Sequence, residues 1–292
     1  MGSTTLVLVT TVPTNDPAVL EQWVGGSQQM TEIIDPATMN RLAMTLGHEP
    51  TLSPGSPLPP LWHFVSFIEA VPAGRLGRDG HPERGGFLPP VALPRRMWAG
   101  SRIRFGAPLP VGALATKTST IRRVACKDGA SGPLCFVTVH HRTTVDGVLC
   151  IDEEQDIVYR EDPDPDSPTR PPQAAPTGAD ESRTVEPTET LLFRYSALMF
   201  NGHRIHYDRD YASSVEGYAG LVVQGPLTAT LLAGLATEDA RELEHFSFRG
   251  MSPLLDTAPF TIHRTASEDG ASLWAAGPDG GLAMTAEAIY RS

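Results

Sequence analysis

The first half of the chain carries a recurrent alternation of apolar and polar residues. Alternation of this kind predicts β-strands with one buried face, and it runs through residues 97–105, 114–126, 134–144 and 148–159. An apolar segment at residues 60–71 precedes these strands and predicts a helix, as does the patterning of residues 16–23 and 36–46. Asp146 and Gly147 separate the last two strands and are typical of a tight hairpin turn. The sequence therefore predicts helices followed by an antiparallel meander.

The second half has a similar order of patterns. A mostly apolar helix is predicted at residues 226–235, and strands at 243–248, 259–266, 272–276 and 282–290 follow it. A short helix is predicted at residues 208–214 and a strand at residues 190–200. A long antiparallel sheet needs a cover on one face, which an apolar helix supplies. We therefore expect an α+β unit that occurs twice, although two unrelated α+β domains would satisfy the same pattern.

The boundary between the halves is expected in residues 161–187, which are rich in Pro, Asp, Ser and Thr and nearly free of large apolar side chains. Such a segment cannot bury a core and is predicted to be a linker without regular structure. The predicted organisation is an N-terminal unit at 1–160, the linker, and a C-terminal unit at 188–292. The two sheets can join edge to edge, which removes an exposed edge strand.

Composition narrows the functional classes. The 292 residues include 40% hydrophobic and 20% charged residues, with a formal net charge of −11. An acidic surface argues against general binding to nucleic acids or anionic membranes, and no apolar stretch approaches the length of a membrane span. Cys126, Cys135 and Cys150 form no C-x-x-C motif, so free thiols in a reducing compartment are expected. We expect a cytoplasmic protein.

The segment 200–232 carries the most informative motif. Asn201 is followed by four residues and then His206, after which come Asp208, Tyr211 and, further on, Gly225. This arrangement resembles the hydratase motif of the MaoC-like hot-dog family. The sequence RYSALMFNGHRIHYDRDYA is similar to the two-repeat branch that contains mesaconyl-CoA hydratases and mitochondrial-type 3-hydroxyacyl-thioester dehydratases.

The resemblance implies a double hot-dog fold, in which two antiparallel sheets are each wrapped around a central helix. It also implies that the first repeat is non-catalytic and forms a substrate tunnel, whereas the second repeat carries the hydratase motif. The chain departs from the commoner pattern at two positions: Asn201 stands where many relatives have aspartate, and Gln224 stands where many have histidine. An amide cannot accept a proton from water, so a two-residue acid–base mechanism is in doubt.

Three residues are predicted to be catalytic. Hydration of an α,β-unsaturated thioester needs a base that activates water, and a histidine has a pKa suited to taking and returning a proton. An isolated histidine is more often structural, but the motif favours His206 as this base. Asn201 can orient water through its amide. Gly225 precedes Pro226 at a predicted helix start, where free N–H groups favour negative charge and can stabilise an oxyanion.

Other residues near the motif have less specific predictions. The predicted substrate-binding residues are Arg204, Gln224, His203 and Tyr211. Asp208 is predicted to cap the short helix. His203 and His206 stand three residues apart, but no third ligand is apparent, so no metal is expected. The cluster Arg95, Arg96, Arg102 and Arg104 is either a phosphate-binding patch or a solvated face.

The predicted function is that of a hydro-lyase that adds or removes water across the α,β double bond of an acyl thioester. No cofactor is expected beyond CoA or the acyl carrier protein that carries the substrate. Two alternatives remain: a hot-dog thioesterase, which the Asn201–His206 motif disfavours, and a non-catalytic acyl-binding module. The acyl group is left open between a C4–C5 diacid, a fatty acyl chain and a polyketide, and a homodimer is also left open.

Overall fold

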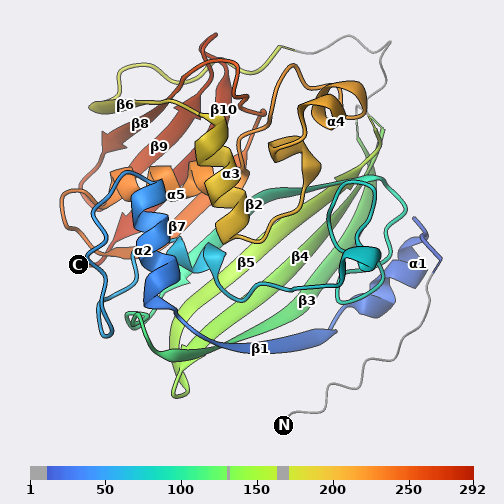
Figure 1. Ribbon diagram of the computed structural model, residues 1–292, viewed down its shortest axis with the longest axis horizontal. Helices are drawn as coiled ribbons and strands as arrows, with labels where there is room; N and C mark the ends of the chain where they lie inside the picture. The colour runs from blue at the N-terminus through green and yellow to red at the C-terminus, as the bar shows by residue number, and fades with distance from the viewer. Residues whose placement is uncertain (1–11, 130–131, 163–170) are drawn as a thin grey trace.

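The computed structural model describes residues 12–129, 132–162 and 171–292, and its named strands form one antiparallel sheet (Figure 1). The strand order across the sheet is β1-β3-β4-β5-β2-β7-β10-β9-β8-β6. The strands are β1 (Ser27–Ile33), β2 (Arg95–Phe105), β3 (Leu114–Gly129), β4 (Gly132–Val145), β5 (Val148–Arg160), β6 (Glu181–Val185), β7 (Leu243–Gly250), β8 (Phe260–Ala266), β9 (Gly270–Ala276) and β10 (Leu282–Tyr290). The predicted strands of both meanders are confirmed, while β1 was not predicted.

The helices are short. The α-helices are α1 (Pro17–Leu20), α2 (Pro36–Thr45), α3 (Glu189–Leu198), α4 (Arg209–Ser214) and α5 (Gly225–Ala236), and the 3-10 helices are η1 (Glu21–Trp23), η2 (Trp62–Val65), η3 (Ala73–Arg75) and η4 (Arg204–His206). The hairpin turn between β4 and β5 is confirmed, with both Asp146 and Gly147 in the left-handed region. In the described part of the chain, no helix is long and apolar enough to cross a membrane.

The two halves meet where β2 pairs with β7, from Gly100 opposite Arg249 to Arg104 opposite His245. The expected edge-to-edge junction is therefore present. At Gly100 the neighbouring strand comes so close that a Cβ atom would lie 2.3 Å from the carbonyl oxygen of Phe248. A glycine at this position lets the two half-sheets fuse into one surface.

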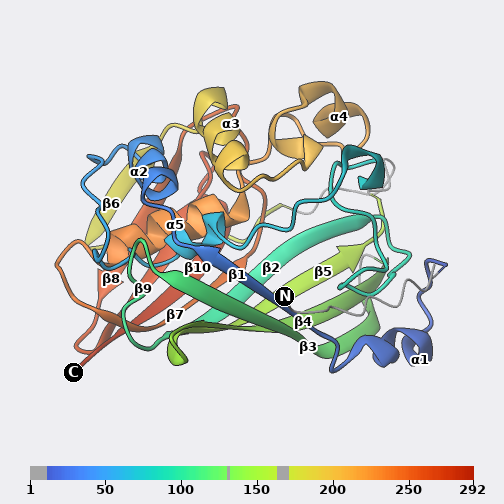
Figure 2. The ribbon, with the colours of Figure 1, turned by 60° about the horizontal axis from the view of Figure 1, so that its bottom comes forward.

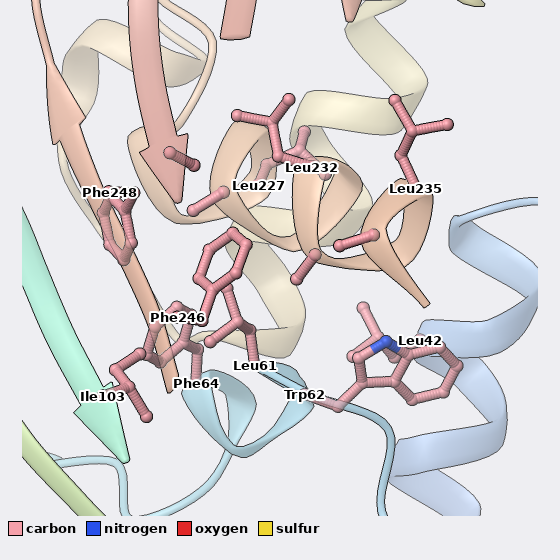
Figure 3. Packing of buried hydrophobic residues seen from close by; sticks show 14 of the residues in the cluster. Leu42, Leu61, Trp62, Phe64, Ile103, Leu227, Leu232, Leu235, Phe246 and Phe248 are labelled. Carbon is pink, nitrogen blue, oxygen red and sulfur yellow. The ribbon is translucent and has the colours of Figure 1, made fainter. Parts of the chain in front are cut away.

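In the second half, α5 lies across the inner face of β7–β10 (Figure 2). Leu227, Leu232 and Leu235 are almost fully buried on this helix, and they pack in one cluster with Phe246 of β7 (Figure 3). Both faces of the contact are apolar, so burial of this area stabilises the unit. The predicted central helix of the second half is confirmed.

The predicted central helix of the first half is wrong. Of residues 60–71, only Trp62–Val65 are helical, as the single 3-10 turn η2. Leu61 and Phe67 have φ angles of 66° and 57°, which break the chain on both sides of this turn. The run of apolar residues reflects burial near the junction, where Trp62 and Phe64 pack in the same cluster as α5 (Figure 3). Continuous apolar runs indicate burial without specifying a helix.

The predicted strand at residues 190–200 is also wrong, because this segment forms α3. Thr188 caps the helix by accepting a hydrogen bond from the Leu191 N–H. Leu192, Tyr195 and Ser196 are buried at helical spacing on one face. The apolar residues of this segment fit both the two-residue repeat of a strand and the 3.6-residue repeat of a helix. The N-cap Thr188 favours the helix.

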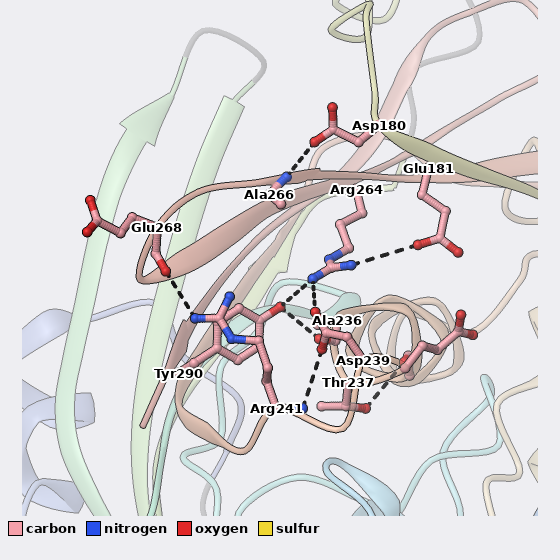
Figure 4. A network of polar contacts seen from close by, with 12 residues as sticks. Asp180, Glu181, Ala236, Thr237, Asp239, Arg241, Arg264, Ala266, Glu268 and Tyr290 are labelled. Atoms are coloured by element: carbon pink, nitrogen blue, oxygen red, sulfur yellow. Dashed lines mark hydrogen bonds and ion pairs between the residues drawn. The ribbon is translucent and has the colours of Figure 1, made fainter. Parts of the chain in front are cut away.

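The expected linker is not free of regular structure. Its last part forms β6, which pairs with β8, whereas residues 163–170 lie outside the described residues. A polar network holds this edge together (Figure 4): Arg264 of β8 contacts Asp239 at 2.5 Å and Glu181 of β6 at 3.9 Å. The Asp180 carboxylate accepts a hydrogen bond from the Ala266 N–H at 2.8 Å. The C-terminal part of the segment therefore belongs to the second half of the sheet.

The expectation of three free thiols is wrong as well. Cys126 and Cys135 face each other across β3 and β4 and are joined in a disulfide. Cys150 is free and buried. Adjacent strands brought the pair together, which the spacing in the sequence did not reveal.

Candidate active site

A cavity of about 1260 Å³ lies between the two halves. The second half contributes Asn201, His206 and Gly225 to its lining, and the first half contributes residues of η2 and of β2–β5. One cavity of this size accommodates a ligand that spans both halves. The first half has room for it because no helix equivalent to α5 covers its sheet among the described residues.

His206 closes η4 and is buried, and its Nδ1 atom lies 2.7 Å from the carbonyl oxygen of Val222. A carbonyl can only accept, so Nδ1 carries the proton and donates it to Val222. The Nε2 atom is therefore left with a lone pair. Burial lowers the pKa of His206 to about 4. The imidazole is thus neutral near pH 7 and has the tautomer of a base.

Asn201 lies just beyond the end of α3 and lines the same cavity. The chain leaves the helix through Phe200 in a left-handed conformation with φ 48°. The Asn201 N–H then donates to the carbonyl of Ser196, and its Oδ1 atom accepts a hydrogen bond from the His203 N–H at 3.0 Å. One end of the amide therefore fixes the loop, and the described residues offer no hydrogen-bond partner to the Nδ2 end.

Gly225 is the first residue of α5, after the N-cap Gln224 and before Pro226. A Cβ atom built on Gly225 would meet no other atom within 4 Å, so the space beside this backbone is open. The N-terminus of an α-helix carries a partial positive charge and unpaired N–H groups. Gly225 also lines the cavity, so this helix N-terminus is a position where an oxygen that gains negative charge would be stabilised.

The four predicted substrate-binding residues fall into two groups. His203 lines the cavity, and its ring lies 5.3 Å from that of His206. Arg204, Tyr211 and Gln224 do not line it: Arg204 pairs with Asp208 at 2.8 Å and stacks over Tyr211, while Gln224 is buried and donates to Leu192 and Ser196. The structure places these three polar side chains in contacts within the protein, and their part in substrate binding stays a prediction. Asp208 caps α4 as predicted.

The four arginines of β2 also fall into two groups, of which one lines the cavity and the other does not. Arg95 and Arg96 line the cavity, whereas Arg102 and Arg104 are exposed on the other face of the strand. Arg95 is buried and pairs with Glu216 of the second half at 2.6 Å. This ion pair links the two halves, and Arg102 pairs on the outer surface with carboxylates of β5.

Two site residues were missed by sequence reasoning: Asp79 and His81, in a loop of the first half. The Nδ1 atom of His81 lies 2.9 Å from the Asp79 carboxylate, and the centre of its ring lies 4.1 Å from that of the His203 ring, with the two planes tilted by 40°. The loop reaches the motif because Gly80 and Gly202 touch: a Cβ atom on Gly80 would lie 1.9 Å from the Gly202 carbonyl oxygen. No local pattern signals a contact between segments so distant in sequence.

The electrostatics of this cluster favour neutral imidazoles. Burial lowers the pKa of both His81 and His203, and for His203 the neighbouring His81 lowers it further. Burial alone would raise the pKa of Asp79, but its hydrogen bond with His81 and the nearby imidazoles hold this pKa well below the usual range. Ligand atoms of Asp79, His81 and His203 lie within 4.8 Å of one another, so these three residues have the geometry of a metal site. The expectation of no metal stays a prediction.

The fold is shared with proteins of known structure. The fold is similar to a MaoC-like dehydratase from Phytophthora capsici, with a TM-score of 0.68 and 13% identity over 94% of this chain and 98% of that chain. It is also similar to a Mycobacterium tuberculosis protein described as having a double hot-dog fold, with a TM-score of 0.54 and 13% identity over 92% of this chain and 96% of that one. The predicted double hot-dog architecture is confirmed.

The sequence defines the family. Residues 61–256 match the family described as hydroxyacyl-thioester dehydratase type 2. The chain is 48% identical to a mesaconyl-C(4)-CoA hydratase from Chloroflexus aurantiacus over 267 residues, which is 90% of this chain and 95% of the relative. The chain belongs to the hydroxyacyl-thioester dehydratase type 2 family. It is a hydro-lyase of acyl thioesters, as the motif predicted.

Proposed function

We propose that the chain hydrates an unsaturated acyl-CoA and that His206, Asn201 and Gly225 form the catalytic centre. The observation that carries this proposal is the tautomer of His206. Its Nδ1 atom is committed to Val222, so the Nε2 lone pair is available in a cavity that Gly225 also lines. Asn201 lines the same cavity, and its Nδ2 amino group can donate a hydrogen bond to water or to the substrate.

The reaction then proceeds with one base. His206 Nε2 accepts a proton from water as the water oxygen bonds to Cβ, and the double-bond electrons move towards the thioester carbonyl. The Gly225 N–H and the N-terminus of α5 stabilise the enolate oxygen. The imidazolium returns its proton to Cα as the enolate collapses, which regenerates neutral His206. The overall change is the addition of one water molecule, and no cofactor takes part.

The proposed substrate is a CoA thioester of mesaconate or of a closely similar unsaturated diacid. The mesaconyl-C(4)-CoA hydratase from Chloroflexus aurantiacus, 48% identical to this chain, supports both the CoA carrier and the small diacid. A cavity of about 1260 Å³ also has space for the pantetheine arm beside a short acyl group.

The test is turnover of mesaconyl-C4-CoA, followed by the loss of ultraviolet absorbance of the conjugated thioester and by the mass gain of one water. His206→Ala should reduce kcat by about 10²–10⁴-fold, the usual contribution of general acid–base catalysis. His245→Ala is the matched control, because this histidine is exposed on β7, does not line the cavity and should leave kcat unchanged. Full turnover by His206→Ala contradicts the assignment, and release of free thiol instead of hydration supports a thioesterase.

A further inference from the structure

The inner face of the first half-sheet is polar where it meets the cavity. Four side chains from three adjacent strands line it there: Lys117 of β3, His141 of β4, and Glu153 and Gln155 of β5. We call these four residues the polar floor. In the second half, the corresponding face is apolar and is covered by α5. Buried polar groups are costly without partners, so a polar floor inside a cavity indicates a polar ligand.

Three of the four floor residues are held by neighbours within the protein. Glu153 accepts a hydrogen bond from the Ser101 hydroxyl at 2.7 Å and lies 3.4 Å from the His63 Nε2 atom. These contacts hold the pKa of Glu153 at about 2 despite its burial, so it is a carboxylate. His141 bridges Ser119 at 2.7 Å and Gln155 at 3.1 Å. The polar floor is therefore rigid, and these side chains already have polar partners.

Lys117 differs from the other three. Within residues 12–129, 132–162 and 171–292, its ammonium makes no hydrogen bond and no ion pair, and it lies 5.2 Å from the centre of the Phe67 ring. Burial lowers the pKa of Lys117, while the more distant carboxylates of Glu153, Glu32 and Glu69 favour the charged form. A cation that lines a cavity without a direct partner is a site for an anion.

The choice of a lysine at this position is also informative. The chain contains 23 Lys and Arg residues, and only Lys117 and Lys127 are lysines. Arginine carries the charge almost everywhere else, including the buried Arg95–Glu216 pair. A lysine offers a compact point charge on a long flexible stem, which suits a single carboxylate oxygen inside a confined cavity.

We propose that Lys117 binds the second carboxylate of the substrate, the one that is not part of the thioester. This inference rests on the proposed function, since it gives the acyl group of that same site a binding partner. Gly225 and Lys117 line the same cavity, and no central helix fills the first half among the described residues. A fatty acyl chain would leave Lys117 without a partner and would place apolar carbon on the polar floor, which is unfavourable.

The test compares diacid and monoacid thioesters with Lys117→Met, which keeps the length of the side chain and removes its charge. A charge-assisted hydrogen bond contributes about ten- to hundredfold in binding. We expect Lys117→Met to lose about that factor in kcat/KM for mesaconyl-C4-CoA and in affinity for succinyl-CoA. Turnover of crotonyl-CoA and affinity for butyryl-CoA, which lack the second carboxylate, should not fall.

Lys127→Met is the matched control, because Lys127 is exposed, also lies over an aromatic ring and does not line the cavity. Equal losses for diacid and monoacid ligands in Lys117→Met, or no loss for either, would overturn the proposal. The binding arm separates the two claims. If succinyl-CoA is preferred through Lys117 but no enoyl-CoA is hydrated, the carboxylate site stands and the proposed function fails. If crotonyl-CoA is hydrated but diacid ligands are not preferred, the proposed function stands and the carboxylate site fails.

Discussion

The two halves of the chain have the same strand plan and opposite interiors. In the second half, α5 fills the curve of β7–β10 with an apolar contact centred on Leu227 and Leu232. In the first half, the described residues place the short turn η2 in the corresponding region, and Lys117 and Glu153 of the sheet border a cavity instead of a core. Under the proposals above, one repeat supplies a helix N-terminus for chemistry, and the other supplies space and polar groups for the acyl part of the substrate.

Neither half forms the cavity and its histidine cluster alone, because loops from both halves pack against each other. The motif loop with His203 and His206 packs against Asp79 and His81 of the first half. The Arg204 N–H donates to the Asp79 carbonyl at 2.9 Å, which fixes the two loops to each other. The first repeat lacks the hydratase motif, yet it still orients the motif of the second repeat.

The largest difference between the two halves is expected at the N-terminus of α5. Gly225→Val places a branched side chain in the open space beside the N–H, where it meets the incoming thioester and not the protein. We expect kcat/KM to fall by about 10²–10³-fold, the usual loss when an oxyanion donor is removed. Gly234→Val changes the same helix at an exposed position with equally open space and provides the control for helix propensity. If both variants retain wild-type kcat/KM, the thioester does not bind at Gly225.

Sequence patterns predicted the second half well because its elements satisfy local rules. The alternating strands, the capping residue Asp208 and the Gly225–Pro226 helix start are all found as expected. His206, Asn201 and Gly225 line one cavity, although their roles stay predictions. These features depend on residues close in sequence, which is why periodicity and spacing could identify them.

The features that were missed depend on distant contacts. The apolar residues 60–71 are buried by the other half, so their hydrophobicity did not indicate a helix. Asp79 and His81 reach the motif through contacts between distant segments, among them the close approach of Gly80 to Gly202. The Cys126–Cys135 pair needed the register of β3 and β4. A single sequence contains no signal for such pairings.

A smaller effect is expected on the free energy of unfolding when one buried side chain is truncated in each half. Leu232→Ala removes a fully buried side chain from the contact between α5 and its sheet. Such truncations cost about 2–5 kcal/mol because a cavity remains. Ser119→Ala removes one hydroxyl that hydrogen-bonds to His141 of the polar floor, and a single hydrogen bond contributes less than a buried leucine side chain, so we expect a loss of roughly 1 kcal/mol. Denaturant unfolding measures both, and equal losses would show that the first half is packed like the second.

The smallest effect is expected in the pH dependence near neutrality. Burial lowers the pKa of His206 from its ordinary 6.5 to about 4, so the folded enzyme keeps a neutral base well below pH 6. The pH profile of kcat/KM should therefore stay flat between about pH 6.5 and 5 and fall only as the pH approaches 4. The stability of the fold also decreases as the pH falls. The unfolded chain takes up the His206 proton near pH 6.5, whereas the folded chain takes it up only near pH 4, so protonation favours the unfolded chain within this window. An acid limb at pH 6.5 in the profile would show that His206 is solvated in the working enzyme, and that the cavity is not closed around it as the structure indicates.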